Sequence, residues 1–232
     1  MSSEFLDGKQ YEVVASFKDL IKAEFNEKIN AFCWHRKLTG DFKEIVSKLQ
    51  LIGEVTEVSI DDLSNLELSE AASLARGHII NDLTLLTRSG AQPVLNLIKA
   101  YPRDEELGFI STDVYSFHVD RSPIRTDTFL CTYHGTAGDI IPSDQVEQKI
   151  RIPDLQQKLR DLHQGSEIAF EKFLTENFFD LHYQPKPGST PKNLGVAHLW
   201  KLAVDYPGQK AMPCVHRAPI ERKGEYRLLL IC

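Results

Sequence analysis

Apolar residues recur at helical intervals through the first part of the chain. The segments 41–52 and 68–89 each place their apolar side chains along one stripe of a helix. Ser69, followed by Glu70, is typical of a residue at which a helix begins. The pattern predicts that residues 1–90 form a mainly helical scaffold.

After Gly90 the pattern changes to short runs rich in branched and aromatic side chains, which are typical of β-strands. The runs are PVLNLIKAY, DVYSFHVD, TDTFLCTYHG, LGVAHLWKLAVDY and EYRLLLIC. Between about 143 and 194 two amphipathic helical patterns and a turn-rich stretch interrupt them, and an insert of this size commonly forms a wall or lid over a site. We therefore expect an α+β fold in a single domain, 1–232, with a β-rich core over 91–232.

The run DVYSFHVD contains an imidazole and a carboxylate two residues apart. Because alternate residues of a strand share a face, His118 and Asp120 are predicted to point the same way. Together they suit a divalent transition metal, and His216, just before the last strand, is a candidate for a third ligand. His198 is a weaker candidate, because no turn and arginine-bearing strand follow it. A hydrogen-bonded His–Asp pair without a metal is an alternative that the motif by itself leaves open.

Arg227 is predicted to share a strand face with the apolar residues Leu229 and Ile231. A guanidinium on an apolar face needs a partner, because an uncompensated buried charge is costly, and its planar fork best matches a carboxylate. Either an acid of the protein or a bound ligand supplies that carboxylate.

Composition and charge narrow the classes of partner. The 232 residues carry 27 basic and 33 acidic side chains with no long block of one sign, so we expect no nucleic-acid partner. The start of the chain lacks the pattern of a signal peptide and no apolar run is long enough to span a bilayer, so we expect a cytoplasmic protein with no membrane partner. The four cysteines are scattered, which favours reduced thiols. No feature predicts the oligomeric state.

His118-x-Asp120, the distant His216, and Arg227 one strand later together resemble the pattern of the Fe(II)/2-oxoglutarate-dependent oxygenases. The segments INAFCWHR, FHVDR, CTYHG, HRAP and YRLLL are also similar, in the same order, to a bacterial family catalogued only as a domain of unknown function. The oxygenase resemblance implies a double-stranded β-helix, which is a cupin-like jelly roll with the metal at its mouth, here with N-terminal helices packed on it.

The resemblance also implies roles for individual residues. His118, Asp120 and His216 would be the Fe(II) ligands, and Arg227 would bind the distal carboxylate of the co-substrate 2-oxoglutarate. With dioxygen as a further reactant, such an enzyme oxidises a substrate C–H bond by hydroxylation, desaturation or cyclisation. Asp120 argues against halogenation, because in this superfamily halide takes the place of a missing carboxylate ligand.

Further residues are candidates for binding the co-substrate. Thr132 and Tyr133 lie on opposite faces of one predicted strand, so only one hydroxyl is expected to face the site, and Tyr133 is preferred. The alternative for Tyr133 is a tyrosine packed at the edge of the barrel. Lys201 is an alternative anchor to Arg227, but it equally fits a snorkelling residue at a sheet edge.

Three arginines adjoin the expected metal ligands and are candidates for binding a small anionic substrate: Arg121, Arg125 and Arg217. Arginines in such loops are also commonly solvated. The remaining histidines are expected to be surface or core residues without a metal: His35, His78, His134, His163 and His182.

Three functions stay open on the sequence. The first is the iron oxygenase. The second is a cupin-like metalloenzyme that does not use 2-oxoglutarate, in which Arg227 would pair with Glu221 or Glu225. The third is a metal-free β-barrel that serves as a binding module.

Overall fold

The computed structural model of the protein describes residues 10–104, 106–163, 165–222 and 224–232. The expectation about a signal peptide concerns the start of the chain, of which residues 1–9 lie outside the described part. Of the helices within the described ranges, none is long and apolar enough to cross a membrane.

Two curled sheets, almost entirely antiparallel, form the centre of the molecule. The larger has seven strands in the order β1-β2-β11-β6-β13-β4-β3, and the smaller has six in the order β10-β7-β12-β5-β9-β8. Strands β1 and β2 pair in parallel. The strands of the larger sheet are β1 (Tyr11–Val14), β2 (Ala31–Trp34), β3 (Val55–Val58), β4 (Val94–Ile98), β6 (Asp127–His134), β11 (Leu199–Ala203) and β13 (Arg227–Ile231). Those of the smaller sheet are β5 (Phe117–His118), β7 (Asp139–Ile140), β8 (Val146–Gln148), β9 (His182–Pro185), β10 (Lys192–Asn193) and β12 (His216–Arg217).

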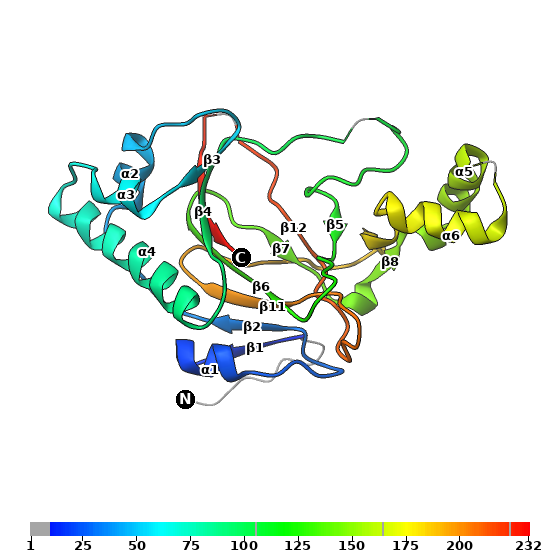
Figure 1. Ribbon diagram of the computed structural model, residues 1–232, viewed down its shortest axis with the longest axis horizontal. Helices are drawn as coiled ribbons and strands as arrows, with labels where there is room; N and C mark the ends of the chain where they lie inside the picture. Colours follow the sequence, from blue (N-terminus) through cyan, green and yellow to red (C-terminus); the bar gives the residue numbers. More distant parts are fainter. Residues whose placement is uncertain (1–9, 105, 164, 223) are drawn as a thin grey trace.

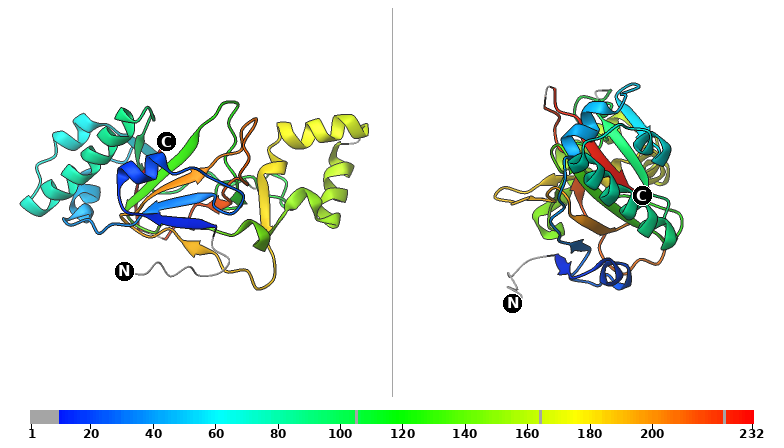
Figure 2. Two further views of the ribbon diagram at one scale, coloured as in Figure 1. Left: turned by 90° about the horizontal axis from the view of Figure 1, so that it is seen from below. Right: turned by 90° about the vertical axis from the view of Figure 1, so that its left-hand side faces the viewer.

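The helices within 42–88 lie at the opposite end of the sheets from those within 153–176, and the short helix over 17–22 lies beside β1 and β2, as Figure 1 and the left view of Figure 2 show. Their bounds are α1 (Phe17–Lys22), α2 (Phe42–Lys48), α3 (Ile60–Ser64), α4 (Glu70–Arg88), α5 (Pro153–His163) and α6 (Glu167–Glu176). The long helix α4 begins where the sequence predicts, because the hydroxyl of Ser69 accepts a hydrogen bond from the backbone N–H of Ala72. The fold is therefore a mixed α+β arrangement.

The two faces of the larger sheet have different neighbours. On one face, Cys131, Tyr133 and Leu228 pack with apolar residues of α4 such as Ile79. On the other face, side chains of the larger sheet meet those of the smaller sheet in a second cluster. That cluster includes Leu130, Trp200, Leu202, Leu229 and Ile140. The space between the sheets is thus separate from the helix-covered core.

The first 90 residues contain strands that the sequence analysis did not predict. Strands β1, β2 and β3 are each four residues long and join the edges of the larger sheet. Runs this short carry little periodic signal, and pairing with strands far along the chain stabilises them. The helices expected within 41–52 and 68–89 are confirmed, and they extend over 42–48 and 70–88.

The expected insert contains two helices and a hairpin. Helices α5 and α6 pack on each other and on Ile110 and Phe179 in a cluster of their own. Strands β8 and β9 form an antiparallel hairpin that adds to the edge of the smaller sheet, directly beside β5. The hairpin is the part of the insert that pairs with the strand carrying His118.

Candidate metal centre

Two adjacent strands of the smaller sheet position the histidines of the predicted motif. His118 ends β5 and His216 begins β12, and the two residues are direct cross-strand partners. Cross-strand partners project from the same face, and Ile140, the partner of His216 on β7, belongs to the cluster between the sheets. Both imidazoles therefore face the space between the two sheets.

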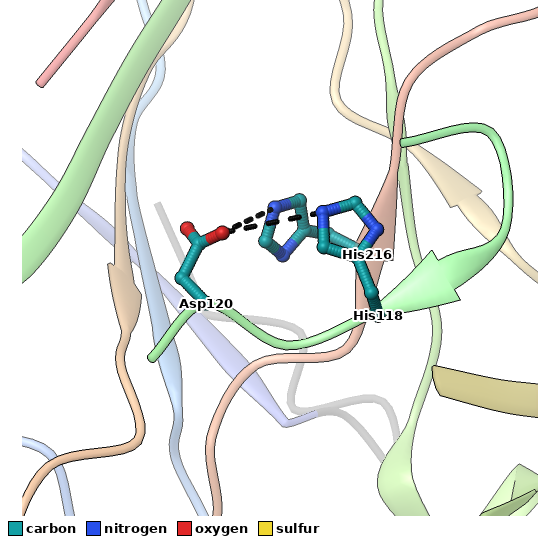
Figure 3. Close-up of side chains that lie close together, drawn as sticks. All are labelled: His118, Asp120 and His216. Atoms are coloured by element: carbon teal, nitrogen blue, oxygen red, sulfur yellow. Dashed lines mark ion pairs between the residues drawn. The ribbon is translucent and has the colours of Figure 1, made fainter. Parts of the chain in front are cut away.

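Asp120 lies just beyond the end of β5, which is shorter than the sequence predicted. After His118 the chain leaves the smaller sheet, and the Asp120 carbonyl accepts a hydrogen bond from the backbone N–H of Asp205 at 2.8 Å. The carboxylate still turns toward the two imidazoles (Figure 3). The predicted convergence holds although Asp120 is outside a regular strand.

The three side chains surround a common point. One ligating atom from each of His118, Asp120 and His216 lies within 4.8 Å of the other two. Oδ1 of Asp120 is 4.0 Å from Nε2 of His118 and 3.7 Å from Nε2 of His216. These distances exceed those of hydrogen bonds, so the geometry does not match a directly bonded His–Asp pair.

The tautomer of each histidine follows from its backbone partner. Nδ1 of His118 is 2.8 Å from the carbonyl of Ser116, and Nδ1 of His216 is 3.1 Å from the carbonyl of Cys214. A carbonyl only accepts, so each Nδ1 carries a hydrogen, and in the neutral form of either ring Nε2 presents its lone pair. Burial and the neighbouring His216 lower the pKa of His118 to about 4, which keeps that ring neutral at neutral pH. Three acceptor atoms therefore converge, an arrangement that a cation stabilises.

Thr128 of β6 fixes the carboxylate, a role that the sequence analysis did not assign. Its hydroxyl donates a 2.5 Å hydrogen bond to Oδ2 of Asp120, which leaves Oδ1 facing the histidines. Burial raises the pKa of Asp120, but His216, the Thr128 hydroxyl and His118 outweigh it, so the net pKa is lowered. Strand alternation in the sequence could have indicated this role, because it places Thr128 on the same strand face as Leu130, which lies between the sheets.

The donor set fits a divalent transition metal. Two imidazole nitrogens and one carboxylate oxygen make a two-histidine, one-carboxylate set that leaves further positions of the ion open. The side chains of His118 and His216 are 14% and 12% exposed, whereas that of Asp120 is 34% exposed. The cluster is therefore most accessible from the side of the carboxylate.

Arg227 lies on the same side of the larger sheet as the cluster. It pairs with Ile98 of β4, a residue of the cluster between the sheets, and it is buried. Its guanidinium carbon is 5.2 Å from the centre of the Tyr101 ring, and burial lowers its pKa. None of the ion pairs formed between described residues involves Arg227.

The acids considered as partners for Arg227 are engaged elsewhere. Glu221 forms a 2.6 Å ion pair with Arg103. Glu225 accepts a hydrogen bond from the Thr136 hydroxyl and lies 4.0 Å from Arg222. The buried guanidinium thus has Tyr101 beside it and no bonded carboxylate among the described residues.

Comparison with known families gives one match. Residues 17–169 match the family described as "Protein of unknown function (DUF1826)". The chain belongs to this family. The DUF1826 match includes His118 and Asp120, whereas His216 and Arg227 lie beyond its last residue. No curated protein matches the chain.

Two of the predicted co-substrate residues of this DUF1826 protein face away from the cluster. The Tyr133 hydroxyl donates a 2.7 Å hydrogen bond to Asp82 of α4, on the helix-covered face of the larger sheet. Lys201 donates to the carbonyl of Ala23 and lies 3.3 Å from Asp127, next to Phe25 on that same face. The preference for Tyr133 and the alternative anchor Lys201 are therefore wrong, because strand alternation directs both side chains toward the helices. Thr132 alternates with Tyr133 and faces the space between the sheets.

The predicted substrate arginines are largely engaged within the protein. Arg121 forms ion pairs with Asp180 and Asp205, at 2.6 and 2.8 Å. Arg217 forms a 2.9 Å ion pair with Asp139. Arg125 is exposed on the loop before β6. Their binding of an anionic substrate stays a prediction.

Two further histidines, His198 and His182, differ in their distance from the cluster. His198, the rival third ligand, has its ring centre 4.1 Å from that of His35, with the two rings tilted, and its Nδ1 accepts a hydrogen bond from the backbone N–H of Arg36. His198 is therefore not part of the metal-binding cluster. His182, for which the sequence analysis predicted no role at a site, lies next to His118, with ring centres 5.7 Å apart.

Proposed function

We propose that this DUF1826 protein is a non-haem Fe(II)/2-oxoglutarate-dependent oxygenase that oxidises a C–H bond of a small molecule. The observation that carries the proposal is the convergence of two imidazole lone pairs and a carboxylate between the sheets. Arg227, which is buried on the inner face of the facing sheet and has no bonded carboxylate in the described part of the chain, supports it. Iron and the keto-acid co-substrate would occupy these two positions.

The order of the strands supports a double-stranded β-helix as the fold of the core. Four strands, β4, β13, β6 and β11, are neighbours in the larger sheet, and four, β5, β12, β7 and β10, are neighbours in the smaller one. Along the chain these eight strands alternate between the sheets, except for the step from β7 to β10. This winding supports the proposal of an eight-stranded jelly roll.

In the proposed enzyme, one group of residues would bind the metal and Arg227 would bind the co-substrate. His118, Asp120 and His216 would hold the metal on one side, with Thr128 and the carbonyls of Ser116 and Cys214 fixing their orientation.

Arg227 would pair with the distal carboxylate of 2-oxoglutarate, because its planar fork matches a carboxylate and no acid among the described residues is bonded to it. Iron with this co-substrate supplies the activation of dioxygen, with 2-oxoglutarate converted to succinate and carbon dioxide as the substrate is hydroxylated, desaturated or cyclised.

The test is an anaerobic titration of the purified protein with Fe(II) and then with 2-oxoglutarate. We expect one iron per chain and, after 2-oxoglutarate is added, the weak visible charge-transfer band of the chelate. The variant Arg227→Met should bind iron normally but need at least tenfold more 2-oxoglutarate, because it keeps the apolar stem and loses the fork. The matched variant Lys201→Met, on the opposite face, should behave like the wild-type protein.

Each alternative function has its own outcome in this titration. A bound metal with no charge-transfer band, or a band that Arg227→Met leaves unchanged, would favour a cupin-like metalloenzyme without this co-substrate. Absence of a bound metal would favour a metal-free binding module. Either result contradicts the proposed oxygenase.

A further inference from the structure

His182 belongs to a row of three histidines across the smaller sheet. It is the cross-strand partner of His118, which in turn is the partner of His216, so all three side chains project from one face. The strand that carries His182, β9, comes from the insert between β7 and β10. The insert thereby adds a side chain to the space between the sheets, next to the metal-binding cluster.

The Nδ1 atom of His182 has no hydrogen-bond partner among the described residues, although it is buried. The whole residue is only 4% exposed. A buried polar atom that is left unpaired costs on the order of 1–3 kcal/mol, so native proteins seldom keep one without a reason. His182 is not one of the three residues that could hold the ion together. A ligand bound at this position would supply the missing partner.

The charges around His182 favour an uncharged ligand group. Because His118 is neutral at neutral pH, the charged groups that act on His182 are Lys149, Asp113 and Asp104. The Lys149 ammonium already donates to the Ser116 hydroxyl at 2.7 Å and to the Ser111 carbonyl at 3.1 Å. With one cation against two carboxylates, the surroundings of His182 offer no free positive charge to an anion.

We propose that Nδ1 of His182 hydrogen-bonds a neutral oxygen, a hydroxyl or a carbonyl, on the substrate that enters beside the metal-binding cluster. The inference rests on the proposed function in one respect: it assumes that the substrate binds between the two sheets. His182 is then a substrate-positioning residue supplied by the insert. His182 would contact the part of the substrate that lies against the smaller sheet.

The test uses the Zn(II)-loaded protein labelled with ¹⁵N-histidine, without 2-oxoglutarate, so that it can be read even if the oxygenase proposal fails. Acetamide and acetate are the probes, because they have nearly the same shape and differ in charge. We expect acetamide to shift the Nδ1 resonance of His182 in a saturable way, and acetate to bind at least fivefold more weakly. Absence of a saturable shift with acetamide, or tighter binding of acetate, overturns the proposal.

A second test compares the acetamide affinity of His182 variants with that of the wild-type protein, measured by ligand-observed NMR. His182→Phe fills the site without a polar atom and should weaken acetamide about five- to tenfold, the loss expected for one neutral hydrogen bond. His182→Asn places an amide near the position of Nδ1 and should recover most of the affinity.

Tyr183→Phe is the matched control, because Tyr183 lies on the same strand with its side chain in the apolar cluster on the opposite face of the smaller sheet. Unchanged affinity in His182→Phe contradicts the proposal, as does an equal loss in Tyr183→Phe. The wild-type resonance shift keeps the test decisive if a variant at the buried position does not fold. If the oxygenase proposal is wrong, the charge-transfer band will be missing from the titration with Fe(II) and 2-oxoglutarate. The NMR measurement does not depend on that band.

Discussion

The carbonyl oxygens of Ser116 and Cys214 each accept a hydrogen bond from a histidine two residues further along the chain. These local contacts select the tautomer that directs a lone pair toward Asp120. The third side chain is held differently, by the hydroxyl of Thr128 on the facing sheet. At the scale of residues, the site is therefore organised by groups that would not themselves touch the ion.

Replacing Thr128 by valine should weaken metal binding. The change keeps the shape of the side chain but removes the hydrogen bond to Oδ2 of Asp120, so the carboxylate can turn away from the histidines. Loss of such a supporting contact typically lowers metal affinity about 10- to 100-fold. Calorimetric titration with Co(II) measures the effect.

The control for this variant is Thr132→Val. Thr132 is buried on the same strand and face, but the hydroxyl that is bonded to Asp120 is that of Thr128. It should bind Co(II) like the wild-type protein. Equal affinities for Thr128→Val and the wild-type protein would mean that the hydroxyl does not orient the ligand.

At the scale of elements, a buried polar network fastens α4 to the larger sheet. Arg36, just after β2, forms a doubly hydrogen-bonded ion pair with Asp82 of α4, and Asp82 also accepts from Tyr133 of β6. The side chains of Arg36 and Asp82 are 9% and 1% exposed. This network explains the orientation of Tyr133, whose hydroxyl is engaged on the side of the helices.

Replacing Asp82 by alanine should destabilise the protein strongly. It would leave the Arg36 guanidinium buried without its partner, a change that costs about 3–5 kcal/mol. Tyr133→Phe removes only one hydrogen bond and should cost about 1–2 kcal/mol. Urea unfolding followed by circular dichroism gives both values.

Metal affinity should be unchanged in both variants, because the network lies on the face away from the cluster. If Asp82→Ala costs no more than Tyr133→Phe, the ion pair does not fasten the helix as described. A loss of Co(II) binding in Tyr133→Phe would instead reopen the interpretation that Tyr133 serves the site.

At the scale of the whole molecule, the metal-binding cluster joins the two sheets. The histidines belong to the smaller sheet, whereas Asp120 is bonded to Thr128 of the larger sheet and to the backbone that follows β11. An ion at the cluster would therefore cross-link elements that are far apart in the chain. Binding to the folded state alone raises the free energy of unfolding.

Adding Co(II) to the metal-free protein should raise its thermal midpoint. At a concentration 100 times the dissociation constant the expected stabilisation is about 2.7 kcal/mol, which corresponds to about 5–10 °C for a chain of this size. Differential scanning calorimetry measures the shift, and EDTA should reverse it. The variant His216→Ala should show little shift. An equal shift in that variant would locate metal binding elsewhere.

Local patterns predicted much of the secondary structure and the central motif. The helices over 42–48 and 70–88 and the strands β4, β6, β11 and β13 are confirmed, because each has a periodicity that its own residues determine. The placement of Arg227 on one face with Leu229 and Ile231 is also confirmed. Alternation along one strand is a local property, and it needs no knowledge of the fold.

The sequence by itself determined the types of the longer elements, the pairing of His118 with Asp120 as candidate ligands, and the apolar surroundings of Arg227. Only the tertiary structure decided that Tyr133 and Lys201 face the helices, that Thr128 holds Asp120, and that His182 lies beside His118. The reason is physical. Periodicity assigns residues to two faces of a strand, but the packing of sheets and helices decides which face is the interior of the site. Contacts such as that between His182 and His118 depend on the register between strands that are distant in the chain.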